Sequence, residues 1–275
     1  MKKTFLLIGG DNRLKFLYKS LKNKNFLVEH IYSERYENEK TAIEKINKAD
    51  VIILPIPLSN DQRHILTPLC DKRILIEDII KNARSDALIF GGGEHLLFQN
   101  NKNYVNLLLN EELTLKNAYA TAEATLAIIE ENSSSTIKGE SFAVLGYGRI
   151  GKVLCRLLTL LGGTVTVYAR RPIVLEEASR DGYKVQSFNN LKEFLKYSTV
   201  IINTVPHPVL TEKEILTLKS ETVIIDLASR PGGVDFISAR KHSLCVVHAL
   251  SLPGKFSPKS AAEYIEDTVL KQLET

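Results

Sequence analysis

The sequence predicts an α/β protein of two domains, each built on a parallel sheet. Short apolar segments alternate with amphipathic helical patterns along most of the chain, which is typical of parallel α/β proteins. The length of 275 residues exceeds one average domain, and a hydrophobic content of 44% is ample for packed cores. The apolar segments also fall into two series, and one helical stretch separates them.

Eight apolar segments are expected to form strands. They are 4–10, 49–57 and 86–93 in the first series, and 142–148, 164–170, 199–206, 222–229 and 243–250 in the second. Helical spacing over 121–129 predicts a crossing helix that ends near the polar cluster at 132–135. We therefore expect an N-terminal domain at 1–120 and a second domain at 121–256.

The last part of the sequence predicts one more helix. Ser257 can cap it and Pro258 can occupy its first position. Its apolar face is formed by Ala261, Ile265, Val269 and Leu270. An apolar face of this kind needs a partner, so we expect residues 257–275 to pack back on the N-terminal domain.

Charge and composition limit the classes of partner. The net charge of +4 comes from 36 basic and 32 acidic residues without a basic run, which argues against nucleic acid and weakly favours small anions. Cys70, Cys155 and Cys245 follow no metal or disulfide spacing, so we expect no metal site and a reducing, cytoplasmic environment. We expect no membrane association, because no apolar stretch approaches the roughly 20 residues that span a bilayer.

The stretch AVLGYGRIGKVL at 143–154 carries the strongest local signal. It contains a strand, three glycines and a helix in the order that a dinucleotide-binding loop needs. Glycines permit a tight turn and a close approach of the backbone to a pyrophosphate, and the amides at the helix N-terminus bind phosphate. A structural turn without a ligand is the alternative. The cofactor contacts expected here are Gly146, Tyr147, Gly148, Arg149, Ile150 and Gly151.

Arg170 and Arg171 stand where NAD-specific sites usually have an acid. An acid accepts hydrogen bonds from the ribose hydroxyls, whereas an arginine accommodates a 2′-phosphate. The two arginines therefore predict NADP as the cofactor. NAD remains an alternative, in which the arginines are solvated surface charges, and a flavin is less favoured.

The segment INTVPHP ends a strand at the expected carboxyl edge of the second sheet, where ligands of open α/β folds bind. Asn203, Thr204 and Pro206 are candidate cofactor contacts. His207 is a candidate acid or base because imidazole titrates near neutral pH. The alternative is a loop without a ligand.

The segment IIDLASRPGGVDF ends the next strand. Asp226 lies at the strand end, and Arg230 follows in a loop shaped by two glycines. Arginine is suited to hold a carboxylate with two parallel hydrogen bonds, so Arg230 is a candidate for substrate recognition. An ion pair between Asp226 and Arg230 is the simpler interpretation.

Several segments together resemble one family, that of the A-subunit of dipicolinate synthase. They are IGGDNR, NAYATAE, VLGYGRIG, INTVP, DLASRPGGVDF and LSLPGKFSPKSA, and they extend over almost the whole chain. The last two are much more specific than the glycine pattern. Ala120 and Ala124 depart from the family pattern, which has proline and glycine there.

The resemblance implies two Rossmann-like parallel-sheet domains with an interdomain crevice. It also implies a flavoprotein-like partner, the B-subunit of dipicolinate synthase. The implied activity is formation of pyridine-2,6-dicarboxylate (dipicolinic acid) from a dihydrodipicolinate-type precursor of the diaminopimelate pathway. The implied setting is the mother cell of a sporulating bacterium.

This chemistry sets requirements for the site. A cyclic dihydropyridine dicarboxylate becomes aromatic by losing a hydride and a proton, so the site needs a nicotinamide acceptor, a base and cations for two carboxylates. The catalytic candidates are Arg230, Asp226, Glu123 and His207. The substrate-binding candidates are Arg13, Asp11, Thr121, Lys255 and Lys259.

Two rival functions stay open at this point. One is a D-2-hydroxyacid dehydrogenase-like enzyme, which shares the two-domain plan, although the late segment LSLPGKF replaces the His-bearing loop of such enzymes. The other is a nucleotide-binding partner protein without turnover, because fold alone does not establish catalysis. We expect a homo-oligomer, and the base and the direct substrate, a dihydro or a hydroxylated tetrahydro compound, also stay open.

Overall fold

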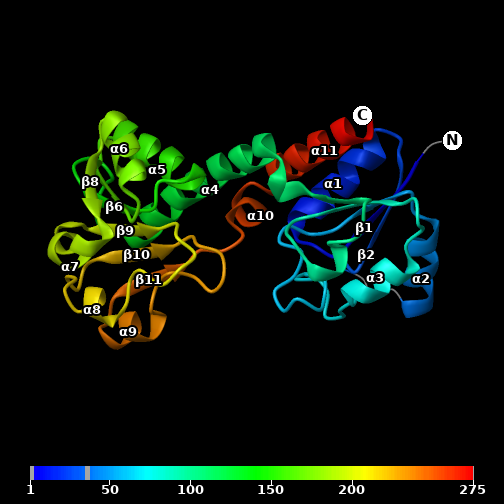
Figure 1. The fold of residues 1–275 in the computed structure, drawn as a ribbon, viewed down its shortest axis with the longest axis horizontal. Helices are drawn as coiled ribbons and strands as arrows, with labels where there is room; N and C mark the ends of the chain where they lie inside the picture. Colours follow the sequence, from blue (N-terminus) through cyan, green and yellow to red (C-terminus); the bar gives the residue numbers. More distant parts are fainter. Residues whose placement is uncertain (1–2, 35–37, 275) are drawn as a thin grey trace. The chain divides into compact units, whose positions relative to one another are not determined.

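The computed structural model describes residues 3–34 and 38–274, which form two compact α/β units (Figure 1). The first unit comprises Met1–Asn117 and Pro253–Thr275, and the second comprises Ala118–Leu252. Each unit is built on a sheet whose strand pairs are parallel. The predicted fold class, two parallel-sheet α/β domains, is confirmed.

The first unit contains, within the described residues, a five-stranded sheet in the order β2-β1-β3-β4-β5. The strands are β1 (Thr4–Ile8), β2 (Leu27–Ile31), β3 (Val51–Ile53), β4 (Leu88–Gly91) and β5 (Tyr104–Asn106). The helices are α1 (Asn12–Asn23), α2 (Glu39–Lys48), α3 (Ile76–Asn82) and α11 (Pro258–Glu274). Thr275, the last residue of the predicted terminal helix, lies outside the described residues.

The alternation of apolar residues along β1 separates the two faces of this sheet. Phe5 and Leu7 are buried in a cluster with residues of α1 and α11, whereas Leu6 and Ile8 join a cluster with residues of α2 and α3. Both faces are therefore covered by helices, as a parallel sheet requires. One charged residue of α11 is also buried: Glu266 accepts a hydrogen bond from the Ser20 hydroxyl of α1 at 2.8 Å.

The second unit contains, among the residues described, a six-stranded sheet in the order β11-β10-β9-β6-β7-β8. The strands are β6 (Ser141–Leu145), β7 (Thr164–Ala169), β8 (Lys184–Ser187), β9 (Val200–Asn203), β10 (Val223–Asp226) and β11 (Cys245–His248). The helices are α5 (Arg149–Leu160), α6 (Pro172–Arg180), α7 (Leu191–Phe194), α8 (Glu212–Ile215) and α9 (Phe236–Lys241). This strand order is that of a dinucleotide-binding Rossmann fold, and the order reverses between β6 and β9.

Two further α-helices lie in the described part of the chain. The long helix α4 (Glu111–Asn132) starts in the first unit and continues in the second, so it begins ten residues before the predicted stretch 121–129. The short helix α10 (Leu252–Phe256) lies where the chain returns to the first unit. Within the described part of the chain, no helix combines the length and the apolar character needed to cross a membrane.

A buried polar network organises the carboxyl edge of the second sheet. Asp226 ends β10 with an exposed fraction of 0%, and its carboxylate accepts hydrogen bonds from Asn203 Nδ2 at 2.8 Å, Ala228 N at 3.1 Å and Gly233 N at 3.1 Å. Asn203 ends the neighbouring strand β9 and also bonds both backbone groups of Val205. One carboxylate thus holds the loops that follow both strands.

We expect Asp226→Ala to lower the free energy of unfolding of the second unit by about 3 kcal/mol, because three buried donors would lose their acceptor. Chemical unfolding, followed by circular dichroism, measures this loss. The control is Asp235→Ala, which removes a more exposed carboxylate that caps α9 and should cost only about 1 kcal/mol. Equal stability of the two variants would contradict this role of Asp226.

Candidate functional site

Three glycines shape the loop between β6 and α5, and each meets a different neighbour. Gly146 has a φ of +95°, and a Cβ there would lie 2.5 Å from the Thr204 hydroxyl oxygen. A Cβ on Gly151 would lie 2.3 Å from the carbonyl oxygen of Gly146, so this glycine lets α5 pack against the loop. A Cβ on Gly148 would have no atom within 4 Å. Gly148 therefore borders open space at the start of α5, where a pyrophosphate could approach the backbone.

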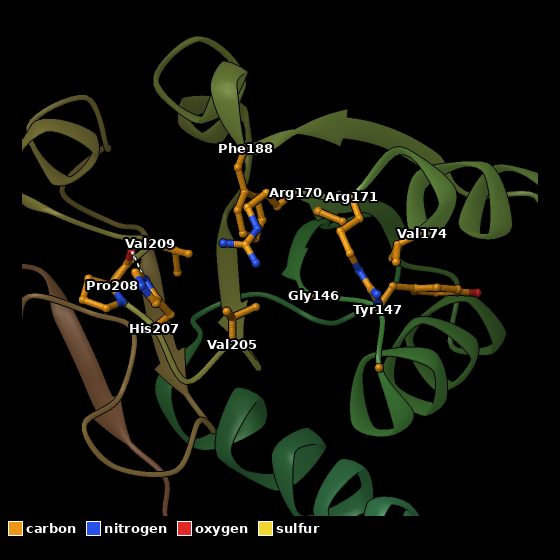
Figure 2. A pocket seen from close by; sticks show the side chains of 12 residues that line it. Gly146, Tyr147, Arg170, Arg171, Val174, Phe188, Val205, His207, Pro208 and Val209 are labelled. Carbon is orange, nitrogen blue, oxygen red and sulfur yellow. Dashed lines mark hydrogen bonds between the residues drawn. The ribbon is translucent and has the colours of Figure 1, made fainter.

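A cavity of about 550 Å³ opens beside this loop (Figure 2). It lies where the strand order reverses, because its walls come from the segments that follow β6 and β9, and also from those that follow β7 and β8. Ligands of open α/β sheets bind at such a reversal. The lining residues are Gly146, Tyr147, Gly148, Ala169, Arg170, Arg171, Val174, Phe188, Val205, His207, Pro208 and Val209.

Arg170 and Arg171 directly follow β7, and both are exposed. Figure 2 shows their side chains extending from the end of this strand toward the cavity. Arg171 is the residue before α6, and its side chain makes no hydrogen bond to cap that helix. The structure thus places two guanidinium groups on the same cavity as Gly146 and Gly148, as a site for a phosphorylated ribose requires.

The sequence interpretation missed the apolar walls of the cavity. Val174 belongs to α6, Phe188 follows β8, and Val205 and Val209 follow β9. Apolar side chains of this kind can contact the flat faces of a nucleotide base. In the sequence each of them is only a single apolar residue in a loop or a helix, which is a pattern that many segments share.

The other predicted residues of the glycine loop have mixed surroundings. The Tyr147 backbone lines the cavity, but its ring points away from the other lining side chains (Figure 2). Ile150 is half-buried and packs against the core of the second unit. Arg149 is exposed in the first turn of α5.

The segment after β9 contributes to the cavity through its backbone and His207. Asn203 is buried in the network with Asp226, and the Thr204 hydroxyl donates to the Leu145 carbonyl at 2.8 Å. Both polar side chains thus already have partners within the protein. Pro206 is exposed, and His207 is an exposed lining residue whose Nδ1 lies 3.4 Å from the Pro208 carbonyl oxygen.

Arg230 is exposed in the loop after β10. No ion pair joins it to Asp226 among the residues that the structure describes, because the Asp226 carboxylate faces the donors of the buried network instead. The simpler interpretation of these two residues as an ion pair is therefore wrong. The catalytic role assigned to Asp226 stays a prediction, but its burial gives it a supporting position behind the loop.

Thr121 and Glu123 lie in the part of α4 that belongs to the second unit. Thr121 is half-buried, and its carbonyl accepts a hydrogen bond from the Thr125 hydroxyl at 2.7 Å. Glu123 is exposed. Their predicted roles toward substrate and proton stay predictions.

The substrate-binding candidates of the first unit form one close group and two exposed lysines. Asp11 caps α1 through Arg13 N, and its carboxylate pairs with the buried Arg13 guanidinium at 2.8 Å. Arg13 also donates to the Ile56 carbonyl. Lys255 is exposed in α10, and Lys259 is exposed in the first turn of α11.

Comparison with known proteins agrees with this geometry. The family model for the N-terminal domain of the dipicolinate synthase A-subunit matches residues 4–111. The model for the NAD-binding domain of D-isomer specific 2-hydroxyacid dehydrogenases matches residues 113–235. The second match identifies the second unit as a nicotinamide-cofactor domain of an oxidoreductase.

Similarity to individual proteins extends over both units. The dipicolinate synthase A-subunit of Bacillus subtilis (strain 168) is 28% identical over 280 residues, which cover 97% of this chain and 94% of that protein. The crystal structure of the dipicolinate synthase A-subunit from Bacillus halodurans has a TM-score of 0.85 and 27% identity, covering 100% of this chain and 99% of that one. The dipicolinate synthase A chain from Bacillus subtilis gives a TM-score of 0.83 and 26% identity, covering 100% and 96%. Over its whole length the chain is therefore similar to dipicolinate synthase A-subunits.

Proposed function

We propose that this protein is the NADP-dependent component of a dipicolinate synthase, which oxidises a dihydrodipicolinate-type precursor to pyridine-2,6-dicarboxylate. The observation that carries the cofactor choice is the pair Arg170 and Arg171 on the cavity beside the glycine loop. Similarity to dipicolinate synthase A-subunits supports the product and the substrate class.

The cofactor domain fits a dinucleotide through its own residues. The space in front of Gly148 is open, and the first amides of α5 lie next to it, so this loop would hold the pyrophosphate. Arg170 and Arg171 would hold the 2′-phosphate through charge-assisted hydrogen bonds. NAD lacks that phosphate, so the arginines favour NADP.

The proposed reaction is a two-electron oxidation of the dihydropyridine ring. Dihydrodipicolinate loses one hydride from a ring carbon and one proton, and the ring becomes aromatic. When bound, NADP⁺ supplies the hydride acceptor. If the direct substrate is the hydroxylated tetrahydro compound, it first loses water and then follows the same step.

The chain must hold two carboxylates and accept one proton. We assign one carboxylate to Arg230, which is exposed on its loop and is not paired with Asp226 in the described structure. Arg13, Lys255 and Lys259 are the candidate cations of the first unit, with Asp11 orienting Arg13. Glu123 and His207 are exposed groups that could accept the proton, and Thr121 lies two residues before Glu123.

Similarity to dipicolinate synthase A-subunits also supports a proposal for the physiological setting. We propose a flavoprotein-like partner, the B-subunit of dipicolinate synthase, together with a homo-oligomeric state of this chain and a role in the mother cell of a sporulating bacterium. The Bacillus subtilis relative is named as a subunit of dipicolinate synthase, and this supports the existence of a partner subunit.

We expect Gly148→Val to weaken NADPH binding at least tenfold while the fold stays intact, because its side chain would fill the open space in front of the loop. Fluorescence titration with NADPH and thermal unfolding measure the two effects. Gly151→Ala is the matched variant, because its Cβ would collide with the Gly146 carbonyl oxygen and should lower thermal stability instead. Unchanged NADPH binding by the Gly148 variant would refute the assignment of the loop.

Replacement of Arg170 and Arg171 by alanine should weaken NADPH much more than NADH. Each lost charge-assisted hydrogen bond to a phosphate is worth about 1.5–3 kcal/mol, so we expect at least a tenfold loss that is specific to NADPH. Isothermal titration with both cofactors gives the ratio of their dissociation constants. Equal losses for NADPH and NADH would show that these arginines do not contact the 2′-phosphate.

Arg230→Lys should reduce kcat/KM for the dihydrodipicolinate-type precursor by about 30-fold or more, because an ammonium group cannot reproduce the two parallel bonds of a guanidinium. The assay follows NADPH absorbance and pyridine-2,6-dicarboxylate, with the flavoprotein-like partner present. NADPH affinity and the melting temperature should stay near wild type. Unchanged turnover would exclude the carboxylate contact, and wild-type protein that binds NADPH without any turnover would favour a non-catalytic role.

A further inference from the structure

The Tyr147 side chain has a position that the glycine loop itself does not require. Its backbone lines the cofactor cavity, whereas its ring points away from it (Figure 2). The residue is 6% exposed, so the ring is packed inside the second unit. Because buried side chains are closely packed, the Tyr147 ring restricts movement of the glycine loop relative to the residues that the ring contacts.

The ring contacts the far end of α6. The Tyr147 hydroxyl donates a hydrogen bond to Asp181 Oδ2 at 2.6 Å, and Asp181 is the residue that caps the C-terminus of α6. Tyr183 packs edge-on against the Tyr147 ring, with centroids 5.8 Å apart. Burial, together with the bond to the Asp181 carboxylate, raises the pKa of Tyr147 above its usual value, and the protonated hydroxyl is the donor in this bond. The bond is therefore a charge-assisted link.

The other end of α6 carries the two arginines of the cavity. The helix runs over Pro172–Arg180, so Arg170 and Arg171 directly precede it, and its nine residues span about 13 Å. A second contact holds the same helix, because Lys152 of α5 pairs with Glu177 in the middle of α6. The glycine loop and α5 thus hold α6 at its middle and at its C-terminal end.

We propose that Tyr147 and Asp181 are positioning residues, which set the preference for NADP over NAD by fixing α6 and its arginines relative to the glycine loop. This inference rests on the proposed function, in which Arg170 and Arg171 both contact the 2′-phosphate of NADPH. NADPH must place its pyrophosphate on the loop and its 2′-phosphate on the arginines at once. A fixed spacing of these two groups keeps the arginines preorganised and lowers the ordering cost of binding.

The physical consequence differs between the two cofactors. If the hydroxyl is removed, α6 can shift or fray at its C-terminal end, and the arginines lose their fixed position. NADH contacts the loop but has no 2′-phosphate, so it is insensitive to that spacing. The ratio of the two dissociation constants therefore reports the spacing, whereas general damage to the loop would weaken both cofactors alike.

The test uses Tyr147→Phe in the full chain, which removes only the hydroxyl oxygen. We expect the dissociation constant for NADPH to rise about threefold to tenfold, as for the loss of one hydrogen bond, and that for NADH to change less than twofold. Asp181→Ala should give the same pattern. The double variant should be no worse than either single variant, because both remove one bond. Asp181→Asn keeps an acceptor and should restore the preference to within twofold of wild type.

Tyr183→Phe is the matched control, because it removes a phenolic oxygen from the neighbouring ring and leaves the bond between Tyr147 and Asp181 in place. Its ratio of dissociation constants should equal that of the wild type. A lower melting temperature of Tyr147→Phe with an unchanged ratio would overturn the inference and make the bond merely structural. If the double alanine variant of Arg170 and Arg171 also leaves the ratio unchanged, the proposed NADP preference itself fails.

Discussion

The carboxylate of Asp226 is the interaction on which the carboxyl edge of the second unit depends. It is fully buried and accepts three hydrogen bonds. The donors are the Asn203 amide at the end of β9 and the backbone amides of Ala228 and Gly233, which follow β10. The Gly233 carbonyl in turn accepts hydrogen bonds from the backbone amides of Val209 and Leu210. The loop that carries His207 is therefore attached to the loop that carries Arg230. A buried acid here is tolerated because every bond that it makes also satisfies a buried donor.

Sequence reasoning predicted the central strands of both sheets but missed strands at their edges. All eight predicted segments contain a strand, and the strands that were not expected are β2, β5 and β8. Each of these three lies at an edge of its sheet. Their side chains are mostly half-buried or exposed, as in the pattern eieiB of β2, so they lack the continuous apolar run that marks a central parallel strand.

The cofactor site could be predicted only in part, because the sequence reveals local patterns but not which distant segments meet. Glycines and arginines that follow apolar strands are local signals, and they line the observed cavity. Phe188 and Val209 reach the same cavity only because the strand order brings distant segments together. Asn203 was expected to contact the cofactor, but the structure places its amide in the network with Asp226. A polar residue at a strand end does not by itself reveal whether it faces a ligand or the protein.

The two units also show why one of them is suited to a dinucleotide. In both, a glycine loop joins the first strand to a helix, but the residue that caps the helix differs: Asp11 caps α1, whereas Gly148 precedes α5. The Asp11 carboxylate accepts from the Arg13 amide in the first turn of α1, so this side chain already occupies a donor that a phosphate would need. A Cβ on Gly10 would also lie 2.5 Å from Leu14, so that loop is already covered by the protein. Gly148 has no side chain and faces open space, so the amides of α5 stay accessible to an anion. The residue at the helix cap therefore distinguishes the two loops. Asp11 itself occupies an amide in the first turn of α1, whereas Gly148 leaves the first amides of α5 accessible to a cofactor.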